Sequence, residues 1–260
     1  TCAAQDAKRV LVAAAHPLAA EAGAEVLRRG GSAVDAAVAV QMVLGLVEPE
    51  SSGIGGGAFM LHWSAAQKRL RSYDGRETAP AAAKPERFLK DGKPLGFLEA
   101  AIGGRSVGVP GVLRMLELAH ARHGRVEWRS LFEPAIRIAE EGFAPSPKFL
   151  AALERAPELR RYFPASRIVN REYAGTLRAL ARGGTRVFYE GEIAKDIVAA
   201  VRAHANPGDL AEEDLRAYRA IEREVLCGPY RAWRVCSMGP PSSGGIALLQ
   251  ILGVLERTPF

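Results

Sequence analysis

The sequence has 260 residues, of which 48% are hydrophobic and 25% are charged. These are the proportions of an ordinary globular protein, and they exclude disordered, collagen-like and coiled-coil chains. The net charge of +6 is spread along the chain and forms no basic stripe with interleaved aromatic residues, so we expect no nucleic acid as a partner.

Two helices are predicted near the start of the chain. A helical pattern runs from Leu18 to Arg29 and is ended by two glycines. Ser32 and Asp35 then have the spacing of a capping box, which starts a second helix over about Ala33–Val47. This second helix is apolar nearly all round, which predicts that it lies inside the protein. Since no apolar run approaches the roughly 18 residues of a membrane span, we expect no such span.

A glycine-rich segment, Gly53–Gly57, leads into a predicted β-hairpin with strands over Ala58–Trp63 and Leu70–Tyr73. The segment lacks the Gly-Lys-Ser/Thr ending of a phosphate-binding loop and precedes a strand instead of a helix, so we do not expect it to bind nucleotide phosphates. Two interpretations stay open for it. It is either a tight turn packed against its neighbours or a wall of an active site, where bare backbone lies beside a substrate.

Helices dominate the rest of the predicted chain, and their alternation with hairpins indicates helices that cover a sheet. Pro134 lies inside a predicted helix, so we expect the first turn of that helix to be irregular or kinked. The last helix is strongly apolar and the chain ends soon after it, which suggests a piece of a larger polypeptide. The predicted helices are Val112–His123, Trp128–Glu141, Glu192–His204, Glu212–Tyr218 and a stretch from Ile246; residues 145–185 are Arg-rich, helical and broken by loops; and the second hairpin has strands Ile221–Cys227 and Tyr230–Ser237.

Cys227 and Cys236 lie nine positions apart on the two strands of the second predicted hairpin, whose turn is expected at Gly228-Pro229. Across a hairpin they are able to face each other and form a disulfide, which suits an oxidising compartment. Two small buried thiols on neighbouring strands are the equally open alternative. The third cysteine, Cys2, is either part of a disordered terminus or the lipid-bearing residue of a processed lipoprotein.

Arg76 is the residue that the sequence singles out for function. It leaves the end of a predicted strand between Gly75 and Pro80, and a guanidinium held on rigid backbone binds a carboxylate through two parallel hydrogen bonds. Glu77 points to the other side of an extended chain, so we expect no direct pairing with Arg76. A surface ion pair of Arg76 is the alternative, and the residues alone leave both interpretations open.

Other candidates carry weaker signals. His120 and His123 share one helix face, but two histidines without a third ligand make a poor metal site, so we expect no metal. Ser242 and Ser243 are predicted as N-caps of the last helix, with catalysis as the minor alternative. Because the sequence contains no GxSxG, HExxH or kinase motif, composition and spacing by themselves predict no reaction.

Six short motifs, found in order, make the chain resemble the gamma-glutamyltranspeptidase family. Any one of them alone is weak, but the ordered set spans nearly all 260 residues. The motifs are Gly30-Gly31-Ser32-Ala33-Val34-Asp35-Ala36-Ala37-Val38-Ala39, Gly55-Gly56-Gly57-Ala58-Phe59-Met60, Arg76-Glu77-Thr78-Ala79-Pro80, Gly108-Val109-Pro110-Gly111, Phe188-Tyr189-Glu190-Gly191 and Pro240-Pro241-Ser242-Ser243-Gly244-Gly245.

The resemblance implies an α+β fold, the α-β-β-α sandwich of the N-terminal-nucleophile hydrolases, with residues 1–260 as a single domain from the N-terminal part of the large subunit. In this family a precursor cleaves itself, and the new N-terminal Thr of the small subunit attacks the γ-glutamyl amide of glutathione or a related compound. The γ-glutamyl group then passes to water, an amino acid or a peptide. The resemblance implies no cofactor; the expected partners are the small subunit and glutathione or other γ-glutamyl small molecules.

The resemblance also implies a role for Arg76, which matches the family's Arg that binds the α-carboxylate of the γ-glutamyl group. No catalytic residue is carried over, because the nucleophile belongs to the small subunit and Thr1 lies upstream of the first motif. Related cephalosporin acylases keep much the same motifs. A glutaryl acylase is therefore the first alternative function, and a non-catalytic binding remnant is the second. We expect the protein to be exported, either to a periplasm or out of the cell.

Overall fold

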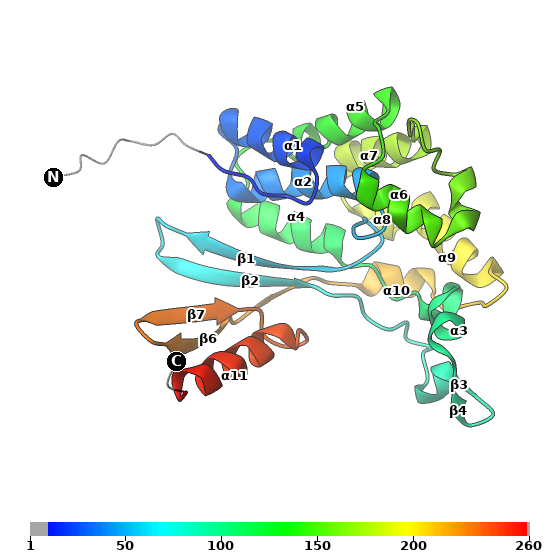
Figure 1. Cartoon of the computed structure of the whole chain (residues 1–260). Helices are drawn as coiled ribbons and strands as arrows, with labels where there is room; N and C mark the ends of the chain where they lie inside the picture. The colour runs from blue at the N-terminus through cyan, green and yellow to red at the C-terminus, as the bar shows by residue number, and fades with distance from the viewer. Residues whose placement is uncertain (1–9, 259–260) are drawn as a thin grey trace. The chain divides into compact units, whose positions relative to one another are not determined.

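The computed structural model describes residues 10–258, and their contacts divide the chain into two compact units (Figure 1). The first unit contains the chain up to Ile54 and the segment Ala119–Phe188. The second unit contains Gly55–Leu118 and the chain from Tyr189 onward. Each unit therefore combines an early and a late segment of the chain, and the single domain over residues 1–260 stays a prediction.

The first unit is helical, and its core is the apolar helix α2 (Ala33–Val47). The predicted capping box is confirmed, because the Ser32 hydroxyl accepts the N–H of Asp35 at 3.1 Å and the Asp35 carboxylate accepts the N–H of Ser32 at 2.7 Å. Most of its apolar side chains are buried, as predicted. It packs against α1 (Pro17–Arg28) and α5 (Glu133–Glu141).

Pro134 divides the helix that was predicted over Trp128–Glu141. Residues Trp128–Phe132 form the 3₁₀ helix η3, and α5 starts anew with Pro134 in its first turn. Proline is tolerated there because the first N–H groups of a helix have no partner within it. The other helices with residues in this unit are α6 (Pro147–Glu154), η4 (Pro157–Arg161) and α7 (Arg171–Gly183), with parts of α4 (Val112–His123) and α8 (Arg186–Tyr189).

The second unit contains a three-stranded antiparallel sheet in the order β1-β2-β5. The predicted first hairpin is confirmed, since β1 (Ala58–Ser64) pairs with β2 (Arg69–Gly75) along its whole length. β5 (Ile221–Arg223) adds to the other edge of β2, where Ile221 pairs with Asp74. β2 is thus the central strand, and it ends immediately before Arg76.

The second hairpin turns at a different place from the predicted one. β6 (Leu226–Tyr230) pairs with β7 (Trp233–Ser237), so Gly228-Pro229 lies within a strand and the prediction of a turn there is wrong. A Cβ on Gly228 would stand 3.2 Å from Leu249, so glycine at this position lets a helix pack closely on the strand. Proline is accepted because a two-stranded sheet leaves one edge of each strand unpaired.

The remaining elements of the second unit are short, apart from the helices α9 and α11, which span Glu192–Ala203 and Gly244–Glu256. The helix α11 (Gly244–Glu256) packs against β6 and β7, as Figure 1 shows at the red end of the chain. Within residues 10–258, no helix is both long and apolar enough to cross a membrane. The other elements are η1 (Pro85–Phe88), β3 (Leu89–Lys90), β4 (Lys93–Pro94), α3 (Phe97–Ala101), η2 (Gly104–Ser106), α9 (Glu192–Ala203) and α10 (Glu212–Ala217).

Candidate functional site

Arg76 directly follows the central strand β2, and its backbone is held from both sides. Its N–H donates a hydrogen bond of 2.8 Å to Oδ1 of Asp74. Its carbonyl oxygen accepts a hydrogen bond of 2.7 Å from the hydroxyl group of Tyr218. The residue predicted to bind a carboxylate therefore has a fixed backbone, and its side chain starts from a defined position.

Asp74 is a buried carboxylate that links Arg76 to the sheet. It is 5% exposed, and its Oδ2 accepts a 2.6 Å hydrogen bond from Nε of Arg223. Arg223 belongs to β5, the strand that pairs with β2 beside Asp74. A buried carboxylate needs such a partner, because an unpaired buried charge is costly. The sheet therefore places both groups that Asp74 contacts.

Two tyrosines support the other side of Arg76. The rings of Tyr218 and Tyr189 stack with their centroids 6.1 Å apart, and Tyr189 donates a hydrogen bond of 2.9 Å to the carbonyl of Pro110. Burial, together with the nearby carboxylates of Asp74 and Glu77, raises the pKa of Tyr218 to about 12. The Tyr218 hydroxyl therefore stays protonated near neutral pH and keeps donating to Arg76.

Glu77 contacts the guanidinium of Arg76, so the prediction that it would not pair is wrong. The Nε of Arg76 lies 3.4 Å from Oε2 of Glu77. The alternation of side chains holds only within a strand, and β2 ends at Gly75. The Arg76 side chain is 59% exposed and that of Glu77 is 38% exposed, so this ion pair contributes little. Among residues 10–258 Arg76 has no other charged partner, and its two terminal Nη groups are open to a ligand.

Two further motifs of the sequence lie beside the Arg76 motif. Thr78 forms an isolated bridge with Val109, whose N–H donates to the Thr78 carbonyl at 2.8 Å. In the same stretch, the N–H of Gly111 donates to the carbonyl of Gly56 at 2.9 Å. The motifs at residues 55–60, 76–80 and 108–111 are thus brought together by backbone hydrogen bonds.

Gly57 explains part of the glycine-rich segment. A Cβ at this position would stand 2.5 Å from Oε2 of Glu77 and 2.6 Å from the carbonyl oxygen of Gly75, closer than real atoms approach. Of the two open interpretations, the packed turn is therefore confirmed for Gly57. The wall of an active site stays a prediction.

The serines before α11 differ in their roles. Ser243 is the N-cap residue, but its side chain makes no capping hydrogen bond, so that part of the prediction is wrong. The hydroxyl of Ser242 instead accepts the N–H of Gly244 at 3.3 Å. The hydrogen bond of Ser242 is the contact that resembles the predicted capping.

His120 contacts two oxygen atoms within the first unit. Its Nε2 lies 3.3 Å from Oδ1 of Asp35, a fully buried carboxylate, and 3.0 Å from the carbonyl oxygen of Val126. Within the described part of the chain, no group of three or more His, Cys, Asp or Glu residues is able to hold a metal ion. His120 therefore serves the packing of the first unit.

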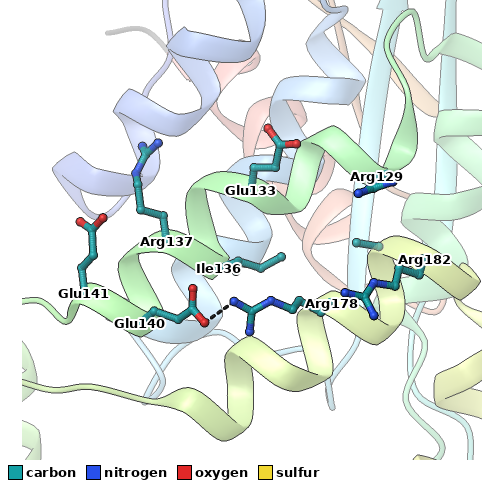
Figure 2. Close-up of a pocket in the computed structure, with 9 residues that line it drawn as sticks. Arg129, Glu133, Ile136, Arg137, Glu140, Glu141, Arg178 and Arg182 are labelled. Carbon is teal, nitrogen blue, oxygen red and sulfur yellow. Dashed lines mark hydrogen bonds and ion pairs between the residues drawn. The ribbon is translucent and has the colours of Figure 1, made fainter.

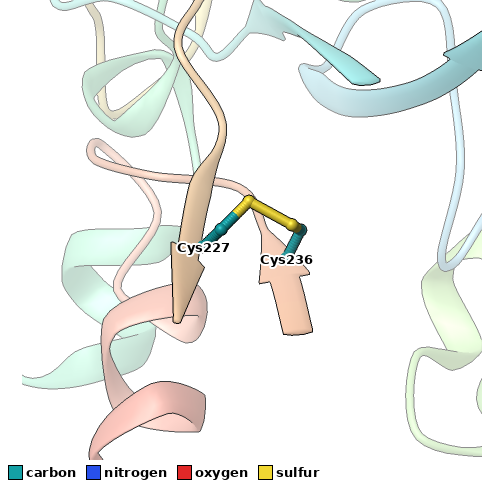
Figure 3. Close-up of a disulfide and its surroundings, with 2 residues drawn as sticks. All are labelled: Cys227 and Cys236. Atoms are coloured by element: carbon teal, nitrogen blue, oxygen red, sulfur yellow. A yellow bond between two sulfur atoms is a disulfide. The ribbon is translucent and has the colours of Figure 1, made fainter. Parts of the chain in front are cut away.

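Cys227 and Cys236 form a disulfide across the second hairpin (Figure 3). They are direct partners in the register of β6 and β7, which decides between the two open interpretations. The predictions for Thr1 and Cys2 lie outside the described residues.

Sequence reasoning missed Asp74, Tyr218 and Tyr189 as neighbours of the site. Asp74 carried a usable signal, since an acidic residue two positions before an arginine at a strand end is able to accept its backbone N–H. Tyr189 lies within one of the six motifs, but nothing in that motif indicates its hydrogen bond to Pro110. Tyr218 is 142 residues from Arg76 and carried no local signal.

Comparison with known protein sequences shows similarity over nearly the whole chain. The family described as Gamma-glutamyltranspeptidase matches residues 19–260. The "Glutathione hydrolase proenzyme" of Bacillus subtilis (strain 168) is 38% identical, over 95% of this chain and 44% of that protein. The protein of the same name from Escherichia coli (strain K12) is 34% identical, over 96% of this chain and 46% of that protein. The chain thus spans less than half the length of these relatives.

Solved structures show the same similarity. The gamma-glutamyltranspeptidase of Helicobacter pylori matches with a TM-score of 0.91 and 33% identity, over 96% of this chain and 75% of that chain. A cephalosporin acylase from Bacillus halodurans matches with a TM-score of 0.83 and 30% identity, over 94% of this chain and 48% of that chain. These matches confirm the predicted α+β fold, the α-β-β-α sandwich of the N-terminal-nucleophile hydrolases. The chain belongs to the gamma-glutamyltranspeptidase family.

Proposed function

We propose that this chain is part of a γ-glutamyltransferase, or glutathione hydrolase, in which Arg76 binds the α-carboxylate of the γ-glutamyl donor. One observation carries the proposal: the backbone of Arg76 is held by Asp74 and Tyr218 while its terminal nitrogens stay open. A guanidinium whose terminal nitrogens are open and whose backbone is held is able to form two parallel hydrogen bonds to a carboxylate. Similarity to proteins named glutathione hydrolase proenzyme supports the same donor.

The proposed reaction uses a nucleophile that this chain does not contain, the N-terminal Thr of a small subunit. The Thr oxygen attacks the γ-carbonyl carbon of the donor, the amide C–N bond breaks, and the leaving amine takes a proton from the Thr hydroxyl by way of the terminal amine. Water or an acceptor amine then breaks the resulting γ-glutamyl ester. Arg76 contributes by fixing the far end of the donor, which places the γ-carbonyl for attack.

The test is the substitution Arg76→Ala in the full-length protein, with kcat/KM measured on glutathione. Loss of a charged bidentate contact costs about 2–4 kcal/mol, so we expect kcat/KM to fall by roughly 30- to 1000-fold. Arg76→Lys keeps the charge without the planar fork, and we expect an intermediate loss. An unchanged kcat/KM for Arg76→Ala would show that Arg76 does not bind the donor.

A glutaryl acylase is the second candidate function. The observation that supports it is the similarity to a cephalosporin acylase structure. The two functions differ in the donor, because a glutaryl group lacks the α-amino and α-carboxylate groups of a γ-glutamyl group. Turnover of glutathione and of a glutaryl amide by the same preparation separates them. Preference for the glutaryl amide would replace the first proposal with the second.

A non-catalytic remnant is the remaining alternative, and the native protein distinguishes it from an enzyme. An enzyme of the proposed kind contains a second chain that begins with Thr. Native mass spectrometry followed by N-terminal sequencing detects such a chain. A single species without one argues for the remnant.

We further propose that the protein is exported to a periplasm or out of the cell. The disulfide between Cys227 and Cys236 supports this location, because structural disulfides persist in oxidising compartments and are rare in the cytosol. Fractionation of the source cells tests the proposal. Recovery of the protein in the cytosolic fraction with both thiols reduced would contradict it.

A further inference from the structure

We propose that a cleft in the first unit binds a small anion through Arg129, Arg178 and Arg182 (Figure 2). The cleft has a volume of about 300 Å³ and lies between α5, α7 and η3. None of its lining residues belongs to the six family motifs, and Arg76 is part of the other unit. The residues that line the cleft are thus different from those that hold Arg76.

The three arginines are carried by elements that are fixed to each other. Arg178 and Arg182 lie four residues apart on α7, so they share one face of that helix. Arg129 belongs to η3, where the neighbouring Trp128 donates a 3.2 Å hydrogen bond to the carbonyl of Leu180 on α7. This hydrogen bond joins η3 to the turn of α7 that lies between Arg178 and Arg182. The backbone positions that carry the three guanidinium groups are therefore held relative to each other.

Positive charge at one end of the cleft is not compensated. Arg178 pairs with Glu140, as the dashed line in Figure 2 marks. Within residues 10–258, Arg129 and Arg182 have no carboxylate partner, whereas Arg137 lies 3.9 Å from Glu25. Like charges four residues apart on a helix repel each other. An anion beside Arg182 would therefore offset the repulsion between it and Arg178.

Besides Glu140, two acidic residues line the cleft, Glu133 and Glu141. In Figure 2, Glu141 lies at the left end beside Arg137, while Arg129 and Arg182 lie at the right. Glu133 lies 4.0 Å from Arg29, which partly balances its charge. One end of the cleft thus carries Arg129 and Arg182 without carboxylate partners among residues 10–258, and the other end carries acidic and basic side chains together. This asymmetry favours a short ligand with its anionic group at the basic end over a long polyanion.

The residues at the basic end indicate the chemistry of the ligand. Arginine binds carboxylate and phosphate oxygens in a planar, two-point geometry that lysine does not match. The volume of about 300 Å³ is at the lower end of the range for small-molecule pockets. The ligand class is therefore a small molecule with a phosphate or carboxylate group. Because Arg129 and Arg182 are exposed, the binding will weaken as salt increases.

Calorimetric titration of the full-length protein with pyrophosphate and with citrate, at constant ionic strength, tests the proposal. We expect the wild type to bind at least one of the two anions, and the tighter one identifies phosphate or carboxylate as the preferred group. The variant Arg129→Gln/Arg182→Gln removes both unpaired guanidinium groups, so we expect its affinity to fall at least about tenfold. Arg171→Gln is the matched control, since Arg171 is an exposed residue of α7 outside the cleft, and we expect unchanged affinity.

The outcomes that overturn the proposal are equally defined. No binding of either anion by the wild type contradicts it, and so does equal affinity of the wild type and the double variant. Arg76→Gln excludes binding at the donor site: if this variant loses the anion, the cleft is not the binding site, while the proposed function stands. Where the double variant does not fold, the single variants Arg129→Gln and Arg182→Gln are each expected to weaken binding.

Discussion

The hydroxyl group of Tyr218 donates a hydrogen bond of 2.7 Å to the backbone carbonyl oxygen of Arg76. Together with the hydrogen bond from the N–H of Arg76 to Asp74, it fixes both polar backbone groups of the residue that we propose binds the donor. Neither Tyr218 nor Asp74 uses a side-chain contact to the guanidinium. Both are therefore positioning residues, which set where the Arg76 side chain begins and leave its terminal nitrogens free.

Tyr218→Phe removes one of these two hydrogen bonds and leaves the ring in place. We expect the free energy of unfolding to fall by about 1 kcal/mol, because the Arg76 carbonyl loses its partner. We also expect KM for glutathione to rise roughly fivefold with little change in kcat, since donor binding is weakened more than the chemical step. Steady-state kinetics and urea denaturation of the full-length protein measure both effects.

Tyr173→Phe is the matched control for this experiment. The Tyr173 hydroxyl also donates to a backbone carbonyl, that of Met42 at 3.3 Å, but both residues belong to the first unit. We expect the free energy of unfolding of this variant to fall and its KM for glutathione to stay at the wild-type value. An unchanged KM in Tyr218→Phe, or an equal rise in the control, would show that Tyr218 does not position Arg76.

Gly57→Ala tests the close packing beside Arg76. The new methyl group would lie 2.5 Å from Oε2 of Glu77 and 2.6 Å from the carbonyl oxygen of Gly75. We expect a loss of about 1–3 kcal/mol in the free energy of unfolding, because the backbone of Gly75 has little freedom to move. Gly55→Ala is the control two residues away, since its methyl group would meet nothing within 4 Å. Denaturant unfolding of both variants gives the comparison, and equal losses would contradict the steric explanation.

The disulfide is expected to stabilise the second hairpin. Cys227 and Cys236 are separated by nine positions, and closing a loop of this size stabilises the folded state by about 2–3 kcal/mol in the chain-entropy account. Cys227→Ser/Cys236→Ser is expected to lower the free energy of unfolding by that amount. Dithiothreitol should destabilise the wild type to a similar degree and leave the double variant unchanged. A double variant that responds to dithiothreitol as strongly as the wild type would place the effect elsewhere.

Local signals predicted the elements of the fold that depend on neighbouring residues. The capping box at Ser32 and Asp35 and the two strand-like runs at Ala58–Trp63 and Leu70–Tyr73 gave the correct helix start and the correct hairpin. The Gly-Pro step at residues 228–229 led to a wrong prediction of a turn, since both residues lie within β6. Its role depends on Leu249, which packs on Gly228 from a helix that follows later in the chain.

The candidate site was predictable only in its central residue. Arg76 was found from its motif and its place at a strand end, but the pairing with Glu77 was missed because alternation ends with the strand at Gly75. Tyr218 lies 142 residues away in sequence, and no local pattern indicates such a contact. Contacts of this kind depend on how distant segments pack, which a pattern of neighbouring residues does not contain.

His16 is expected to make stability depend on pH. Its Nδ1 accepts the N–H of Leu18 at 3.2 Å and so caps α1, which requires that Nδ1 carry no proton. Burial lowers the pKa of His16 below its ordinary value of 6.5, although the Glu48 carboxylate acts in the opposite direction. As pH falls below 6.5, the unfolded state therefore binds a proton before the folded state does. The stabilisation is fully present above pH 6.5 and is lost progressively as pH falls toward the lower folded-state pKa.

His16→Asn separates this effect from other titrations, because asparagine offers an acceptor oxygen for the N–H of Leu18 and carries no titrating group. The free energy of unfolding, measured at about pH 7.5 and at about pH 5, should fall less with acidification in the variant than in the wild type. Some dependence will stay, since burial, and then the positive charge of Arg71, lower the pKa of His62 as well. If His16→Asn shows the same fall as the wild type, protonation of the α1 cap does not limit stability in acid.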